Sequence, residues 1–281
     1  MKRSGGDDAD GWIALAASEI GTSHKRKHLP CQDFSRITVA RGGLVVGAIA
    51  DGIGSAEHSD VGSKLAVETA SDYLLDRVPE LLARRGKSAR EHCLQALAKA
   101  AEAIKACAAR HKRSGDDYGC TLILVLAAPD WLAALSVGDG FVVWRAAKSE
   151  AHEVLLPPDK SEFVNYTSSI TSSDIQETLR FEFRNEAPAF VLASSDGLLY
   201  LVLESETWKP HLPFFNFIES YITRDDMTSD KLRKLLADPQ INALTDDDKT
   251  LLLACSCEHM PAEPKHKVVA AKSAHDRSAD D

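Results

Sequence analysis

Four short acidic segments could do chemistry in this sequence, because each begins or ends a run of apolar residues. They are Cys31-Gln32-Asp33, Asp51-Gly52-Ile53-Gly54, Ser195-Asp196-Gly197 and Asp246-Asp247-Asp248. A carboxylate beside a buried apolar run is costly unless a cation or hydrogen-bond donors compensate its charge. If the fold brings these segments together, their oxygen atoms form a site suited to Mg²⁺ or Mn²⁺.

Not every aspartate needs this explanation, since Asp is also common in turns and at helix caps. Asp33, and Asp139 in the segment Val137-Gly138-Asp139-Gly140, fit that ordinary explanation when each is taken alone. Asp51, Asp196 and Asp247 fit it less well, because they follow strand-like apolar runs or lead into one.

The run Asp246-Asp247-Asp248 leaves the last ligand open by one residue in either direction. We favour Asp247, because the residues after Asp248 then align as a strand that begins Lys249-Thr250-Leu251.

Composition is that of one large globular domain. The chain has 281 residues, of which 44% are hydrophobic and 27% charged, enough for a sizeable core. The formal charge of −9 argues against nucleic-acid binding, which depends on a basic surface.

No apolar run approaches the roughly 20 residues that span a bilayer, and the first residues have no apolar signal-peptide core. The six cysteines lack paired CxxC spacing and are expected to be reduced packing residues of a cytoplasmic protein. Cys255-Ser256-Cys257 with His259 has a poor spacing for structural zinc.

The elements that must position the acidic residues are mostly short strands, rich in Val, Ile, Leu and aromatic residues. We predict them at Trp12–Ser18, Phe34–Val39, Leu44–Ala50, Thr121–Ala127, Trp131–Val137, Phe141–Arg145, Leu179–Phe183, Phe190–Ser194 and Thr250–Cys255. Pro129-Asp130 and Arg41-Gly42-Gly43 are typical of hairpin turns.

Two long helical patterns lie together in the middle of the chain. Apolar residues recur at helical spacing from Val61 to Leu82, and a second helix is predicted to begin at the capping box Ser88-Ala89-Arg90-Glu91. Consecutive helices flanked by strands indicate an α+β sandwich, not a βαβ repeat.

The order of the motifs resembles the metal-dependent Ser/Thr protein phosphatases of the PP2C (PPM) family, from about Trp12 to Cys255. The residues that carry the resemblance are Asp51-Gly52-Ile53-Gly54, Gly119-Cys120-Thr121, Gly138-Asp139, Ser195-Asp196-Gly197 and Asp247-Asp248. Gly21-Thr22-Ser23-His24, Pro30-Cys31-Gln32-Asp33 and Ser161–Thr167 are typical of a bacterial subgroup. Any one of these motifs is weak, but their order along the chain is specific.

The resemblance implies a four-layer αββα sandwich, with two antiparallel sheets packed face to face and helices on both outer faces. It implies hydrolysis of phosphoserine and phosphothreonine by a hydroxide that bridges two Mn²⁺ or Mg²⁺ ions, with a third ion possible. Such paired ions lower the pKa of a shared water and neutralise the phosphoryl oxygens.

The site residues follow from the matching motifs. Asp51, Asp196 and Asp247 would be the catalytic ligands, with the Gly52 carbonyl on one ion. Asp33 would act through metal-bound water, and Asp139, with Asp196, would hold the third ion.

Two departures from the family pattern concern the substrate side of the site. His28 occupies the position where many members have a phosphate-binding Arg, so His24, Arg26 and His28 are the candidates for binding the phosphate. The alternative interpretation is that the basic segment His24–His28 is a solvated loop with no role in binding. Ile53 occupies the position of a general-acid His found in some members, so water would protonate the leaving group.

We expect disorder at residues 1–10 and 259–281, a phosphatase domain over 11–258, and a flap-like insertion at about 159–186. The expected partners are a phosphorylated protein substrate and a Ser/Thr kinase that opposes it, with no nucleic acid and no membrane, and the protein is expected to be a monomer. The alternatives are a pseudophosphatase that binds phosphoproteins without turnover, and a phosphohydrolase of small molecules.

Overall fold

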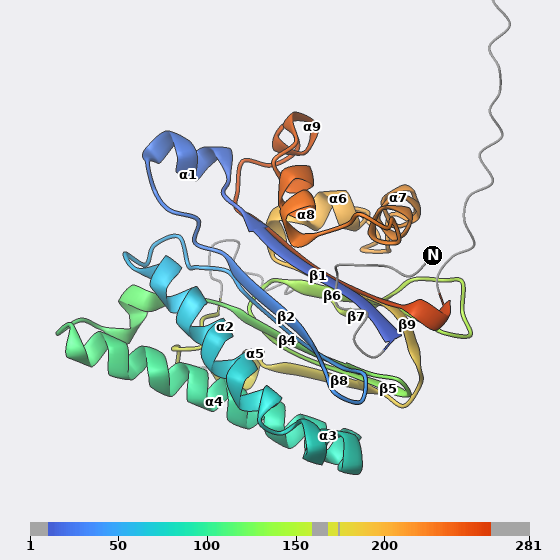
Figure 1. Cartoon of the computed structure of the whole chain (residues 1–281). Coiled ribbons are helices and arrows are strands. Elements are labelled where there is room, and N and C mark those ends of the chain that lie inside the picture. The colour runs from blue at the N-terminus through green and yellow to red at the C-terminus, as the bar shows by residue number, and fades with distance from the viewer. Residues whose placement is uncertain (1–10, 159–167, 174, 260–281) are drawn as a thin grey trace, which may run out of the picture.

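The computed structural model describes residues 11–158, 168–173 and 175–259. Their strands form two antiparallel sheets (Figure 1). The first sheet has the order β1 (Trp12–Glu19), β10 (Lys249–Ser256), β9 (Pro188–Ser194), β6 (Phe141–Ala146) and β7 (Glu153–Leu156). The second has the order β2 (Phe34–Ala40), β3 (Leu44–Ala50), β4 (Leu122–Ala128), β5 (Trp131–Val137) and β8 (Arg180–Arg184).

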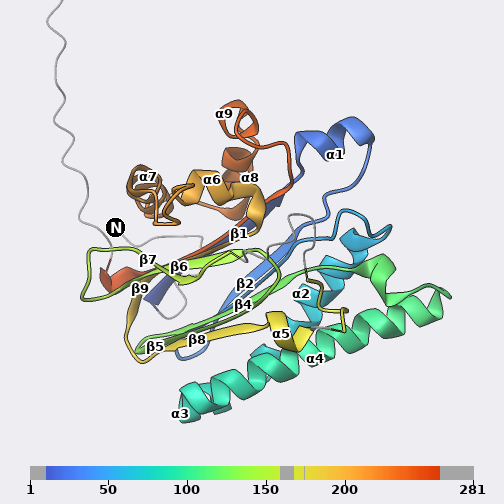
Figure 2. The same ribbon diagram turned by 180° about the vertical axis from the view of Figure 1, so that it is seen from behind.

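Helices cover the outer face of each sheet, as opposite views show (Figures 1 and 2). The second sheet is covered by α2 (Ser59–Leu75), α3 (Val78–Arg84) and α4 (Gly86–Arg110). The first sheet is covered by α6 (Leu199–Val202), α7 (Leu212–Ile222), α8 (Ser229–Leu236) and α9 (Pro239–Asn242). Two further short helices are α1 (Thr22–Lys27) and α5 (Ile175–Thr178).

Three hydrophobic cores correspond to the three spaces between these four layers. In β3, Val46, Ala48 and Ala50 pack in the core that includes α2 and α4. Val45 and Ile49, on the other face of the strand, belong to the core between the sheets. A strand buried on both faces reads as a continuous apolar run, which is why these strands were recognisable from sequence.

The predicted αββα sandwich is confirmed, and each predicted strand is present with ends shifted by at most a few residues. The short edge strand β7 was missed. The predicted capping box is wrong: α4 begins at Gly86, and Ser88 lies buried inside its first turn. Arg85, with φ of 52°, separates α3 from α4, and its carbonyl accepts from Ala89 N at 3.0 Å, so the helical hydrogen bonds begin before Ser88.

The first predicted helix is divided in two. Helix α2 ends at Leu75, and α3 begins at Val78 with Pro79 in its first turn. Proline lacks the N–H that a continuous helix would use there, so the chain restarts a helix instead of extending one.

The four buried cysteines Cys93, Cys107, Cys120 and Cys255 are free thiols, as are Cys31 and Cys257. No helix among the described residues has the length and apolar character to cross a membrane. The expected disordered ends, except His259, lie outside the described residues, as do the motif Ser161–Thr167 and the start of the expected flap. His259 is the last residue of a short 3-10 helix, Cys257–His259. The later part of the expected flap contains strand β8 (Arg180–Arg184), which pairs with β5.

Candidate metal centre

Three strand ends bring three carboxylates together. Asp51 directly follows β3, Asp196 lies two residues after the last residue of β9, and Asp139 lies in the turn between β5 and β6. Carboxylate oxygens of these residues all lie within 4.8 Å of one another. Because β3 and β9 belong to different sheets, the cluster exists only when the sheets are packed face to face.

A cavity of about 340 Å³ surrounds this cluster and contains more of the predicted residues. Asp247 and Gly52 also line it, together with Gln32 and Thr121. Asp33 is only 4% exposed, and its Oδ2 accepts a hydrogen bond from the Ser195 hydroxyl at 2.8 Å. The structure therefore places all the predicted metal ligands in or beside one cavity.

Burial of so many carboxyl groups raises their pKa values. Desolvation is the main cause for Asp33, whose pKa rises from 3.8 to about 6. Desolvation, then the charges of Asp139 and Asp247, raise the pKa of Asp196 to about 7. Desolvation, followed by the charges of Asp33 and Asp196, raises the pKa of Asp51 well above its ordinary value. Without a cation, these carboxyl groups therefore bind protons at a higher pH than an ordinary aspartate does.

This donor set fits a hard divalent cation. Asp33 Oδ1 and Asp196 Oδ1 are buried and have no hydrogen-bond partner among the described residues. Carboxylate oxygens of this kind are the ligands that Mg²⁺ and Mn²⁺ prefer, and a bound cation would remove the cost of burying their charges.

Backbone contacts hold the Asp51 segment in place. Asp51 N donates to Thr121 Oγ1 at 2.9 Å, and Thr121 N donates back to the Asp51 carbonyl at 2.8 Å. Ile53 N donates to the Gly119 carbonyl at 2.9 Å. The motif Gly119-Cys120-Thr121 is thus the structural partner of the motif that begins at Asp51.

Two glycines in the motifs are required by close packing. A Cβ atom on Gly52 would lie 2.7 Å from Ser59 Cβ and 2.8 Å from Gln32 Cβ. A Cβ atom on Gly197 would lie 2.0 Å from the Asp248 carbonyl oxygen. Any side chain at either position would push apart the segments that carry the carboxylates.

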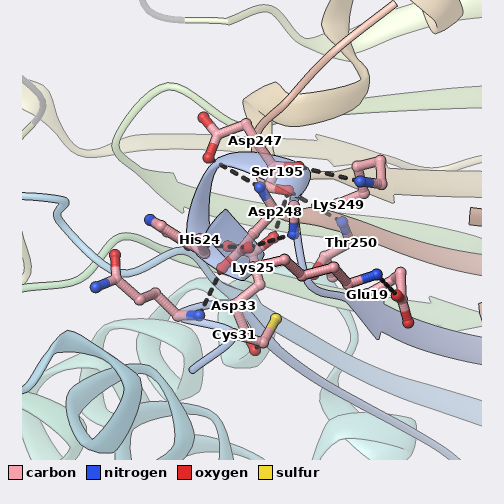
Figure 3. A network of polar contacts seen from close by, with 12 residues as sticks. Glu19, His24, Lys25, Cys31, Asp33, Ser195, Asp247, Asp248, Lys249 and Thr250 are labelled. Atoms are coloured by element: carbon pink, nitrogen blue, oxygen red, sulfur yellow. Dashed lines mark hydrogen bonds and ion pairs between the residues drawn. The ribbon is translucent and has the colours of Figure 1, made fainter. Parts of the chain in front are cut away.

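Asp248 ties two N-terminal segments to the start of β10, a role that the sequence analysis missed. Its Oδ1 accepts from Gly21 N and its Oδ2 from Gln32 N, each at 2.6 Å, and it is only 3% exposed. His24 Nδ1 lies 3.0 Å from Asp248 Oδ1. Figure 3 shows Asp248 at the centre of these contacts, with Asp247 beside it.

Arg180 fixes the turn that carries Asp139 and was also missed. It donates to the Gly138 carbonyl at 2.5 Å, to Ser136 Oγ at 3.0 Å and to the Gly140 carbonyl at 3.4 Å. Nothing in the sequence near Arg180 signals this role, because the turn lies about 40 residues earlier.

The basic candidates separate in space. His24 lines the cavity, with its side chain 13% exposed. Arg26 is 68% exposed and pairs with Asp246 at 2.9 Å, and His28 ends α1 in the left-handed region with φ of 56°. Neither Arg26 nor His28 is among the residues that line the cavity.

The molecule is an αββα sandwich in which carboxylates near the ends of strands form a candidate metal site. The chain belongs to the protein phosphatase 2C family, whose model matches residues 20–237. It is 31% identical over 266 residues to serine/threonine-protein phosphatase 3 of Escherichia coli (strain K12), with 88% of this chain and 99% of the relative covered. The resemblance seen in the motifs is thereby confirmed.

Solved structures share the fold at lower identity. A crystal structure of a bacterial serine phosphatase has a TM-score of 0.58 and 14% identity and covers 86% of this chain and 97% of that chain. Serine/threonine phosphatase Stp1 from Staphylococcus aureus has a TM-score of 0.59 and 13% identity, with 90% and 98% covered. PppA of Pseudomonas aeruginosa has a TM-score of 0.58 and 18% identity, with 88% and 99% covered.

Proposed function

We propose that this protein hydrolyses phosphoserine and phosphothreonine in proteins, with Mn²⁺ or Mg²⁺ held in the cavity beside Asp51. The observation that carries the proposal is the cluster of Asp51, Asp139 and Asp196, whose oxygens lie within 4.8 Å of one another. Family membership supplies the reaction class.

The residues divide the work among them. Asp51, the Gly52 carbonyl, Asp196 and Asp247 would hold the catalytic pair of ions, and Asp139 would help to hold a third. Asp33 accepts from Ser195 through one oxygen, which leaves its Oδ1 for water. Such ions, when bound, activate water at neutral pH and neutralise the phosphoryl oxygens.

His24 is the best placed of the basic candidates to bind the phosphoryl group. It lines the cavity, and its Nδ1 lies 3.0 Å from Asp248 Oδ1. Arg26 is committed to an exposed ion pair, and His28 lies outside the cavity lining. A Ser/Thr kinase that phosphorylates the same substrate is the partner that such a reaction implies.

The test is Mn²⁺-dependent hydrolysis of a phosphothreonine peptide and of p-nitrophenyl phosphate. Asp51→Ala and Asp196→Ala are expected to lower kcat by at least about 100-fold, because each removes a carboxylate from the cation site. Asp230→Ala, at an exposed position on α8, is the matched control. In the same assay His24→Ala should raise KM more than His28→Ala.

Three outcomes would contradict parts of this proposal. Activity that survives both carboxylate substitutions would reject the site. Metal binding without turnover would identify a pseudophosphatase. Equal turnover of nucleotides or sugar phosphates would place the substrate among small molecules.

A further inference from the structure

A groove of about 480 Å³ lies directly beside the metal cavity and shares Asp196 and Asp247 with it. One wall is formed by the residues after Asp196, including Tyr200 and Leu201 of α6. The other is formed by Ile241 of α9 and by Leu244 in the segment that leads to Asp247. The groove is therefore continuous with the site where the phosphoryl group would react.

Two apolar side chains of this groove are open to solvent. Tyr200 is 71% exposed and Leu244 is 64% exposed, the two largest values for large apolar side chains among the described residues. Exposure of apolar surface to water is unfavourable, and the free energy falls when a partner covers that surface. An apolar side chain fits this part of the groove better than a charged one.

A second hollow, of about 570 Å³, shares Tyr200 with this groove. It is lined by Tyr200, His211 and the acidic side chains Glu204 and Glu206. Neither Lys nor Arg is among its lining residues. This hollow favours a positively charged side chain.

We propose that the groove binds the substrate polypeptide next to its phosphorylated residue, with an apolar side chain between Tyr200 and Leu244. A basic side chain farther along the substrate would meet Glu204 and Glu206. The inference rests on the proposed phosphatase function and names its substrate class: phosphoproteins with an apolar residue, then a basic one, on the same side of the phosphorylated residue.

Continuity with the reaction site selects this occupant. An extended chain advances about 3.3 Å per residue, so a polypeptide whose phosphoryl group reaches Asp196 must place its next residues on the adjoining surface. The groove shares Asp196 and Asp247, and Tyr200 in turn lines both hollows. A free small phosphate ester would use neither hollow.

The test measures kcat/KM for a series of phosphothreonine peptides with an alanine background. A single leucine is placed in turn at each position on either side of the phosphothreonine, and a second series adds one arginine beyond it. The wild type is expected to prefer leucine at one position by roughly five-fold, the scale set by partial burial of one apolar side chain. Arginine beyond that leucine should add roughly two- to three-fold, the scale of an exposed ion pair.

Tyr200→Ala and Leu244→Ser are expected to abolish the leucine preference, which is measured as the ratio of kcat/KM values within each variant. Glu206→Gln should lower the arginine preference alone. Leu212→Ser is the matched control, because Leu212 is 59% exposed but lines neither hollow. Its preference should equal that of the wild type.

The failures can be told apart. No turnover of any peptide or of p-nitrophenyl phosphate would contradict the phosphatase activity itself. Turnover with no leucine preference, or a preference that survives both groove substitutions, would overturn the groove alone. A change of oligomeric state in Leu244→Ser on size-exclusion chromatography would assign this surface to a second copy and also overturn it.

Discussion

At the scale of residues, three consecutive aspartates have three different environments. Asp246 has a side chain that is 64% exposed and pairs with Arg26, Asp247 lines the cavity, and Asp248 is 3% exposed. Desolvation raises the pKa of Asp247, as expected for a partly buried carboxylate whose charge no cation compensates. Asp248 instead has its donors supplied by the backbone of Gly21 and Gln32.

We expect Asp248→Ala to lower the free energy of unfolding by ~2–4 kcal/mol, because it leaves two buried N–H groups without an acceptor. Asp248→Asn should lie between alanine and the wild type, since it keeps one acceptor oxygen. Urea denaturation monitored by circular dichroism measures both. Asp246→Ala, at an exposed position, should change stability by less than about 0.5 kcal/mol. Equal losses for Asp246→Ala and Asp248→Ala would contradict the assignment.

At the scale of elements, the site depends on strands whose two faces are both covered by neighbouring layers. Strands β3 and β9 are buried along their whole length, and Asp51 and Asp196 follow within two residues of their ends. The turn that carries Asp139 passes from β5 in one sheet to β6 in the other. Arg180 of the edge strand β8 holds this turn by its carbonyl groups.

Arg180→Met is expected to weaken Mn²⁺ binding about ten-fold, because residues that orient metal ligands contribute to affinity on this scale. Isothermal titration calorimetry on the metal-free protein measures the change without reference to activity. Arg184→Met is the matched control, since Arg184 lies on the same strand and its side chain contacts its neighbours Glu182 and the Phe183 carbonyl. If both variants bind Mn²⁺ like the wild type, the turn does not need Arg180.

At the scale of the whole molecule, the acidic cavity couples stability to pH and to metal. The pKa values of Asp33 and Asp196 rise from 3.8 to about 6 and about 7 when the metal-free chain folds. The folded state therefore binds protons more tightly than the unfolded state. The stability gained from these protons is complete below about pH 4 and is lost as pH rises through about 7.

We therefore expect the Tm of the protein in EDTA to fall between about pH 5 and about pH 8, while Mn²⁺ raises Tm more at the higher pH. Protons compete with the cation for the same oxygens at low pH. At a Mn²⁺ concentration about 100 times Kd, the added stability is ~2.7 kcal/mol. Differential scanning fluorimetry measures Tm, and Asp196→Asn should show a smaller pH dependence. An equal Mn²⁺ effect at both pH values would reject the linkage.

The strands, and the carboxylates that follow them, are predictable from short stretches of sequence. A run such as Leu44–Ala50 that ends in Asp51-Gly52 is a local pattern, and its burial and its charge can both be read from neighbouring residues. The order of such patterns was enough to predict the αββα sandwich and the membership of the family. Local patterns failed at Ser88, because the helical hydrogen bonds of α4 already begin at the Arg85 carbonyl.

The residues that support the carboxylates, and the groove proposed for the substrate chain, become visible in the folded structure. Asp248 holds Gly21 across 227 positions of sequence, and Ser195 donates to Asp33 across 162. Arg180, Tyr200 and Leu244 acquire their surroundings from segments that are far away in the chain. Hydrogen bonding and exposure depend on which groups come into contact after the sheets pack. Strand formation and apolar burial depend mainly on residues that are adjacent in the sequence, so they can be predicted from it.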